Sequence, residues 1–134
     1  MNVADRPVRI DAHQHFWDIE SGEYDWPTPA DGVIHRTFAA GDLQPELAAA
    51  GIDRTVLVQT VNTYRDTDSM LAAAADHRWI GAVVGWIPVT DPDAAEAALD
   101  GRFQGRLAGV PDPVEVDRQD LALILHGDVE RILL

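Results

Sequence analysis

Residues 54–60 have the sequence RTVLVQT, an apolar run that is rich in β-branched side chains. Because such residues favour extended backbone and no polar position alternates with them, the run predicts a strand buried on both faces. A second run of this kind, IGAVVGWI, occupies residues 80–87. Strands covered on both faces are typical of parallel sheets, so the sequence predicts a parallel sheet.

Predicted helices alternate with these strands. Asp42 can cap a helix with Pro45 in its first turn and Gly51 just past its end, since aspartate accepts hydrogen bonds from free N–H groups there. Asp66 or Thr67 can begin the next helix. Its predicted apolar stripe consists of Met70, Leu71, Ala74 and Ala75. Asp91-Pro92-Asp93 predicts the start of a third helix, and Gly101 predicts its end.

Two further strands extend the alternation, at residues 8–12 and 106–110, and residues 116–134 form a predicted C-terminal helical segment. Repetition of strand and helix favours an α/β fold with about four parallel strands, in either a barrel or a doubly wound sheet. A length of 134 residues suits one domain, so we expect a single domain over residues 1–134.

The composition excludes several classes of function. A net charge of −13 repels phosphate backbones, so nucleic acid is not an expected partner. No apolar run approaches the ~20 residues that cross a membrane, and residues 1–9 do not resemble a signal peptide. We therefore expect a cytoplasmic protein. Because there is no cysteine, any bound metal must be held by His, Asp or Glu.

A histidine pair follows the first predicted strand. In extended backbone, residues two apart point to the same side, so His13 and His15 can share a divalent metal. In a parallel barrel, active sites lie at this end of the strands. The alternative is a pair of polar residues that merely closes the strand. The long loop that follows contains the aromatic residues Trp17, Tyr24, Trp26 and Phe38, which argue against disorder.

Several blocks of the chain resemble the amidohydrolase-related family. The string IDAHQHFWD at residues 10–18 is similar to the opening signature of that family. The blocks at residues 24–27, 47–59 and 80–88 are similar to its sugar-lactonase branch, which is typified by L-fuconolactonase and L-rhamnonolactonase. The resemblance extends over residues 8–110, and these blocks together are specific to the family.

The resemblance implies a metal-dependent (β/α)₈ TIM-barrel hydrolase that opens sugar acid lactones. It implies that His13 and His15 bind a divalent metal, with zinc foremost, or orient the substrate, and it leaves the catalytic residues unknown. It also places Trp17, Gln59 and Trp86 where a substrate could touch them. Ordinary barrel packing is the alternative for Gln59, and it is the preferred interpretation for Trp86.

The chain also departs from this family. A complete barrel needs about 250 residues, and the chain has 134. Residues 120–134 resemble the family's final helix, which predicts a first half-barrel over residues 8–110 joined directly to that helix near residues 110–115. The family's further metal ligands and its acid/base aspartate have no match here. His35, His77 and His126 occupy a loop and helix ends and do not replace them.

Three functions therefore compete. The first is a metal-assisted lactone hydrolase, which the family resemblance favours. The second is a non-catalytic half-barrel remnant or interaction protein, which the absence of the second half favours. The third is a homodimer in which two half-barrels cover each other's open edges. For the isolated chain we expect little or no hydrolysis.

Overall fold

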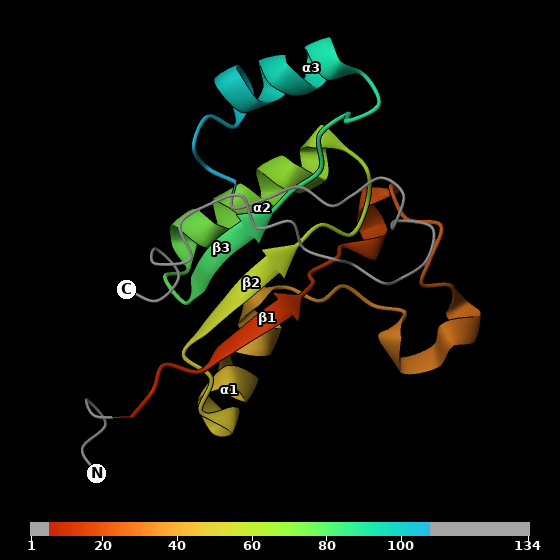
Figure 1. Ribbon diagram of the computed structural model, residues 1–134. Coiled ribbons are helices and arrows are strands. Elements are labelled where there is room, and N and C mark those ends of the chain that lie inside the picture. Colours follow the sequence, from red (N-terminus) through yellow and green to blue (C-terminus); the bar gives the residue numbers. More distant parts are fainter. Residues whose placement is uncertain (1–5, 108–134) are drawn as a thin grey trace.

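The computed structural model describes residues 6–107 of the chain. The sheet has three strands in the order β1–β2–β3, all pointing the same way (Figure 1). Their bounds are Ile10–Gln14 for β1, Arg54–Val58 for β2 and Ile80–Val84 for β3. Both neighbouring pairs are parallel, which confirms the predicted α/β fold class.

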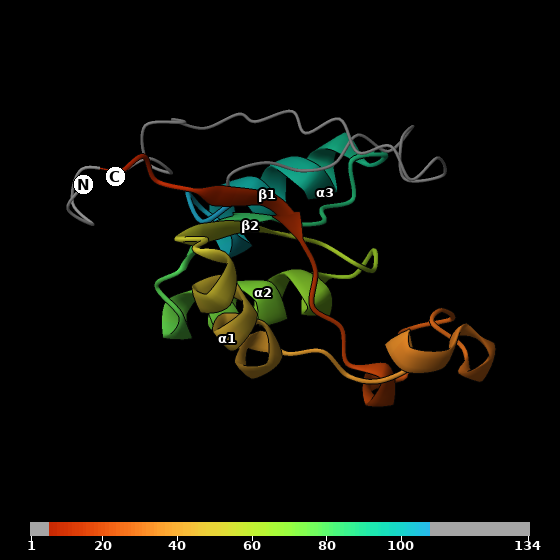
Figure 2. The same ribbon diagram turned by 90° about the horizontal axis from the view of Figure 1, so that it is seen from below.

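Two helices, α1 (Ala40–Ala50) and α2 (Tyr64–Asp76), lie on the same face of this sheet (Figure 2). A third helix, α3 (Pro92–Ala97), continues into the π-helical turn η4 (Ala98–Arg102). Helices α1 and α2 each follow a strand and return the chain to the start of the next one, and α3 follows β3. This strand–helix order is the one that the alternating sequence signals predict.

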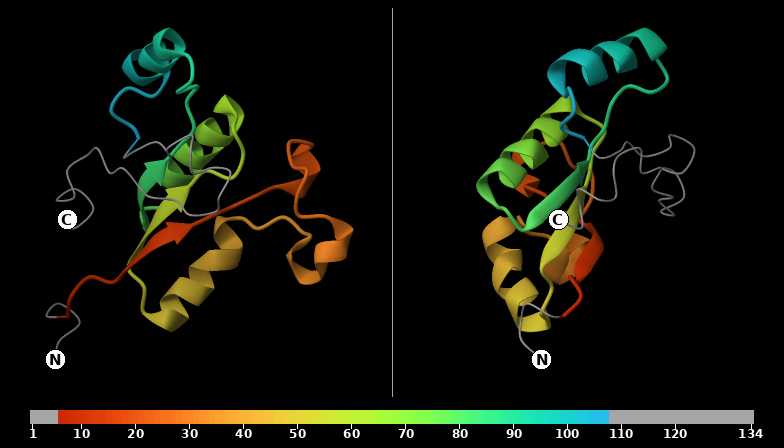
Figure 3. Two further views of the ribbon diagram at one scale, coloured as in Figure 1. Left: turned by 45° about the vertical axis from the view of Figure 1, so that its right-hand side comes forward. Right: turned by 60° about the vertical axis from the view of Figure 1, so that its left-hand side comes forward.

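The long loop between β1 and α1 projects beyond the carboxyl ends of the strands, as Figures 1 and 3 show. It contains two short 3₁₀ helices, η2 (Ile19–Ser21) and η3 (Pro29–Ile34). Functional side chains in parallel α/β folds gather at this end of the strands. The loop is therefore placed where it can form a wall of a site.

Side chains alternate between the two faces of the buried strands. Leu57 of β2 is fully buried among residues of the helix-covered face, whereas Val56 and Val58 belong to a separate cluster on the other face. The helix-side cluster is completed by Met70, Leu71, Ile80, Val83, Ile87, Ala98 and Phe103. Burial on both faces explains why residues 54–58 lack alternating polar positions.

The predicted helix starts were two or three residues late. The helix predicted from Asp42 begins at Ala40, because the Asp42 carboxylate reaches back to accept the Ala39 N–H at 2.9 Å. The helix predicted from Asp66 or Thr67 begins at Tyr64. Thr63 caps it by accepting the Asp66 N–H at 3.0 Å. Both aspartates therefore occupy the third helical position and not the cap.

Two other predicted helix boundaries are confirmed, whereas the predicted strand ends are shifted. Gly51 ends α1 with a φ of 67°, and Asp91 caps α3 by accepting the Ala94 N–H at 3.1 Å, as predicted. Strand β1 continues two residues beyond its predicted end, whereas β2 and β3 stop short of theirs. The predicted strand at 106–110 falls almost wholly outside the described residues, and the predicted helical segment 116–134 falls outside them entirely.

No helix within residues 6–107 is both long enough and apolar enough to cross a bilayer.

Candidate functional site

The structure brings the imidazoles of His13 and His15 together at the carboxyl end of β1. Their Nε2 atoms lie 3.0 Å apart, and the two rings meet nearly edge to face at an interplanar angle of 78°. When two imidazole nitrogens bind the same zinc ion at about 2.0–2.1 Å each, the two nitrogens lie roughly 3 Å apart. The pair thus has the convergence that a shared metal ion requires.

An irregularity in the register of β1 aims these side chains. Asp11 pairs with Thr55 and Gln14 pairs with Leu57, so two residues of β1, at positions 12 and 13, oppose a single residue of β2. The Asp11 carboxylate accepts the backbone N–H of His13 at 3.0 Å and so holds the extra residue in place. Bulges of this kind often redirect side chains next to active sites.

The hydrogen-bond partner of His15 fixes its tautomer. His15 Nδ1 lies 2.9 Å from the carbonyl oxygen of Val58, which can only accept, so Nδ1 carries the hydrogen. The Nε2 atom of the neutral ring is then left with its lone pair directed at His13. A backbone carbonyl that orients one ring nitrogen while the other stays free is typical of metal-binding histidines.

Electrostatics favour the neutral form of His13. Partial burial lowers the pKa of His13 below its usual value, and the neighbouring His15 lowers it further, while Asp11 opposes both effects. A neutral imidazole is the form that binds a metal. Two nitrogen donors suit zinc, which usually has three protein ligands in catalytic sites. Among residues 6–107, however, no three histidine or acidic side chains are grouped to hold an ion.

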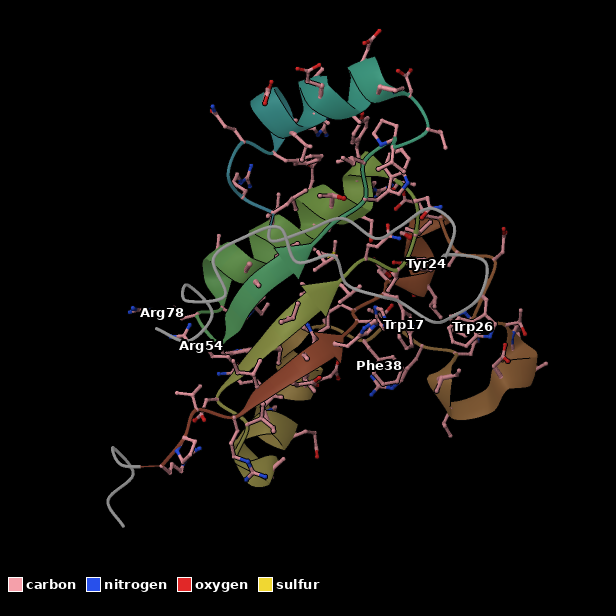
Figure 4. The ribbon with its side chains drawn as sticks, in the orientation of Figure 1. Trp17, Tyr24, Trp26, Phe38, Arg54 and Arg78 are labelled. Atoms are coloured by element: carbon pink, nitrogen blue, oxygen red, sulfur yellow. The ribbon has the colours of Figure 1, made fainter. Side chains whose placement is uncertain are left out.

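Aromatic residues of the long loop form a wall beyond the ends of β1 and β2. Figure 4 shows Trp17, Tyr24 and Trp26 grouped there, whereas Arg54 and Arg78 lie at the opposite end of the sheet. The ring centroids of Trp17 and Trp26 are 6.1 Å apart. Reciprocal backbone hydrogen bonds of 3.1 and 2.9 Å join Trp17 to Phe38 and so close the base of the loop.

A cavity of about 160 Å³ lies between this wall and His15. It is lined by His15, Trp17, Tyr24, Trp26, Pro27, Gln59 and Thr60. Its walls combine one imidazole, three aromatic rings and a few polar groups. Small-molecule sites usually have this mixture of apolar surface and sparse polar groups.

Gln59 lines this cavity directly after β2. Its side chain is buried, with 8% exposed, and its amide nitrogen donates to Asn62 Oδ1 at 3.2 Å. Its carbonyl oxygen has no hydrogen-bond donor in the described part of the chain. A buried acceptor left unpaired is costly, so it can be satisfied by a hydroxyl or amide group of a ligand.

Trp86 does not join this group. The walls of the His15 cavity, as far as residues 6–107 form them, do not include it. Its ring packs against Tyr64 at a centroid distance of 5.3 Å, and its backbone N–H donates to Thr67 Oγ1 at 2.9 Å. These contacts are those of a packed side chain, which was the preferred interpretation for Trp86.

The other described histidines are not grouped with the pair at a metal-binding site within residues 6–107. His35 follows η3, where its backbone N–H donates to Gly32 at 3.0 Å. His77 follows α2, and its ring lies 5.5 Å from that of Trp79. His126 lies outside the described residues. Neither His35 nor His77 belongs to a metal-binding group within residues 6–107.

Sequence reasoning did not identify three polar residues next to the cavity. Tyr24 and Thr60 line it, and the buried carboxylate of Asp66 accepts hydrogen bonds from both. Burial raises the pKa of Asp66, while hydrogen bonds from Thr60, Val61 and Tyr24 oppose that shift. Burial also raises the pKa of Tyr24 to about 12, so its hydroxyl stays protonated at neutral pH. The sequence signal that could have indicated these residues was the position of Tyr24 within an aromatic loop.

The chain matches two curated proteins named L-fucono-1,5-lactonase. It is 43% identical over 101 residues to the one from Burkholderia ambifaria, and the match covers 72% of this chain. It is 34% identical over 95 residues to the one from Burkholderia multivorans, and that match covers 71% of this chain. The chain is related to amidohydrolase-type lactonases. No protein-family model matches it.

Solved structures of the amidohydrolases agree with this relationship. A crystal structure of a Burkholderia multivorans amidohydrolase with bound zinc superposes with a TM-score of 0.70 at 31% identity. A second crystal structure of such an amidohydrolase, with bound HEPES, gives the same TM-score and identity. Each superposition covers 81% of this chain. The described strands and helices therefore correspond to part of an amidohydrolase barrel.

The chain spans only about a third of the curated lactonases that it matches, 35% of one and 32% of the other. It covers 38% of the zinc-bound amidohydrolase chain. Strands β1 to β3 and the histidine pair fall within the described residues. The remainder of the lactonase barrel has no counterpart in residues 6–107.

Proposed function

We propose that this chain supplies the metal-binding histidine pair, and one wall of the substrate cavity, of a hydrolase that opens sugar acid lactones. The observation that carries the proposal is the 3.0 Å convergence of His13 Nε2 and His15 Nε2 at the carboxyl end of β1, beside the aromatic cavity. The lactonase names of the relatives support this substrate class.

A divalent metal, zinc foremost, would be held by His13 and His15. The bound zinc in the related amidohydrolase supports this choice. Such an ion polarises a carbonyl group and lowers the pKa of a water molecule. Two contacts orient the histidines for metal binding. The Val58 carbonyl fixes the His15 tautomer through a 2.9 Å contact, and Asp11 holds the His13 backbone.

The substrate would enter the cavity next to His15. Its volume is about 160 Å³ as residues 6–107 line it. The unpaired carbonyl oxygen of Gln59 would accept a hydrogen bond from a sugar hydroxyl. Trp17 and Trp26 would cover an apolar face of the sugar ring.

A non-catalytic half-barrel remnant or interaction protein is the second candidate. Within residues 6–107, only two side chains converge at the candidate metal site, so a catalytic ligand set is not assembled there. Among these residues β1 and β3 each pair with β2 alone, which leaves two open strand edges. Open edges favour association with another chain, and a homodimer is one form of it.

Zinc titration tests the proposed histidine pair. We expect the protein to bind one Zn²⁺ ion, and His13→Ala or His15→Ala to weaken binding at least about tenfold, because each removes half of the converging donors. His35→Ala is the matched control, since it removes an imidazole at the end of η3, and it should leave the affinity unchanged. Isothermal titration calorimetry measures all four proteins. Equal affinities for His13→Ala, His15→Ala and the unmutated protein would overturn the proposal.

A further inference from the structure

A buried carboxylate lies behind the aromatic wall of the cavity. Asp66 is the third residue of α2, and only 7% of it is exposed. Its Oδ2 accepts the backbone N–H groups of Thr60 at 3.0 Å and Val61 at 3.5 Å. Its Oδ1 lies 3.2 Å from Thr60 Oγ1 and 3.4 Å from the Tyr24 hydroxyl. One side chain thus joins the loop after β1 to the loop after β2.

The hydroxyl groups in this cluster are linked to one another and to Asp66. The Tyr24 hydroxyl and Thr60 Oγ1 are 2.6 Å apart, and both are close to Asp66. An ionised carboxylate only accepts, and it is the strongest acceptor present. Either hydroxyl can donate to the other, and the hydroxyl that does not do so can donate to Asp66 Oδ1, so the carboxylate accepts from Thr60 or from Tyr24. Tyr24 is thereby fixed through a residue that lies 36 positions away in the sequence.

Helix capping does not explain why this carboxylate is buried. The start of α2 is already capped by Thr63, whose hydroxyl oxygen accepts the Asp66 N–H at 3.0 Å. An acidic side chain in the first turn interacts favourably with the helix dipole even when it stays in water. Burial adds a desolvation cost, which raises the pKa of Asp66. The inward position is therefore explained by the groups that Asp66 holds.

Both residues held by Asp66 line the cavity beside His15. We propose that Asp66 is a positioning residue, which acts through Thr60 and Tyr24 to hold the aromatic wall at a fixed separation from His15 so that a sugar ring fits between them. This inference rests on the proposed function. Asp66 itself would not touch the substrate, because it is not among the residues that line this cavity.

The test is ligand binding in Asp66→Asn. L-Fucose is a suitable stable ligand, because its ring carries sugar hydroxyls but no lactone carbonyl that could be hydrolysed. Quenching of tryptophan fluorescence reports binding, since Trp17 and Trp26 line the cavity. We expect the dissociation constant to rise at least about tenfold in Asp66→Asn, because an NH2 group replaces one of the two acceptor oxygens and either the backbone N–H groups or the hydroxyls lose their acceptor.

Two further variants separate positioning from general destabilisation. Tyr24→Phe removes only the hydroxyl group and should weaken binding in the same direction. The double variant should be no weaker than Asp66→Asn alone, because both changes break one chain of contacts. Asp68→Asn is the matched control: Asp68 lies two residues further along α2, partly exposed, and pairs with Arg102. It should bind within about twofold of the unmutated protein.

A second measurement decides the inference without any ligand. Hydrogen exchange should become at least about tenfold faster in peptides from residues 16–38 of Asp66→Asn and Tyr24→Phe, but not of Asp68→Asn. Zinc affinity should stay within about twofold in all three. Unchanged exchange in Asp66→Asn, or equal L-fucose affinity, would overturn the positioning role. Failure of the unmutated protein to bind L-fucose would count against the proposed function alone, and hydrogen exchange would then decide the role of Asp66.

Discussion

The 134-residue chain is expected to open sugar acid lactones at a rate close to the uncatalysed background, even when Zn²⁺ or Mn²⁺ is added. Lactone opening requires a polarised carbonyl, a deprotonated water and a fixed geometry between the two. The histidine pair provides part of the first requirement only. Loss of a general acid/base alone typically lowers the rate by ~10²–10⁴.

The two acids nearest to the pair in sequence are already engaged elsewhere. Asp11 accepts the His13 backbone N–H at 3.0 Å. Asp18 caps η2 by accepting the Glu20 N–H at 3.0 Å, and it also accepts the Thr37 hydroxyl at 2.9 Å. Both carboxylates thus hold local groups of the chain, and within residues 6–107 neither forms a metal-binding group with the two imidazoles.

A pH-stat or indicator assay with several sugar acid lactones measures this prediction. The control is the double variant His13→Ala, His15→Ala, which should give the same background rate as the unmutated chain. Metal-dependent turnover that disappears in the double variant would contradict the prediction. It would also show that the chain completes its site by association or through residues beyond those described.

Leu57→Ala is expected to destabilise the protein by about 2–5 kcal/mol. Leu57 lies in the central strand, has no exposed surface and belongs to the cluster between the sheet and its helices. Truncation leaves a cavity that the neighbouring strands cannot easily close. Because domains are stable by only about 5–15 kcal/mol, this single change removes a large part of the free energy of unfolding.

Urea unfolding followed by circular dichroism measures the loss of stability. Leu99→Ala is the matched control, because Leu99 is 42% exposed in η4 and loses the same atoms from a more solvated position. It should change the free energy of unfolding by less than about 1 kcal/mol. Equal destabilisation by the two variants would show that the sheet–helix core is not organised as described.

The strands could be predicted because their signals are local. The β-branched run RTVLVQT has no polar alternation, and the structure buries both faces of its strand. Helix starts were less accurate, because aspartate can cap a helix or reach back from the third position. Asp42 and Asp66 both do the latter, since Asp42 accepts the Ala39 N–H and Asp66 accepts the Thr60 N–H, and the sequence does not distinguish the two geometries.

The candidate site also combines parts that have a local sequence signal with parts that depend on long-range contacts. His13 and His15 are two residues apart, so extended backbone alone predicts that their imidazoles point to the same side of the strand. Tyr24 and Asp66 are 42 residues apart, and their contact depends on how the long loop folds back over α2. Trp86 was predicted at the end of a strand over residues 80–87 and lies just beyond β3, and its packing against Tyr64 depends on tertiary contacts that no local pattern encodes.

The most direct test of the account is ¹⁵N NMR of the histidine side chains during addition of Zn²⁺. We predict that the Nε2 resonances of His13 and His15 both move to metal-bound values at one equivalent of zinc. The Nδ1 of His15 should keep its hydrogen, which is donated to the Val58 carbonyl at 2.9 Å. Metal-bound shifts at His35 or His77 instead, or at only one member of the pair, would contradict a shared metal site on β1.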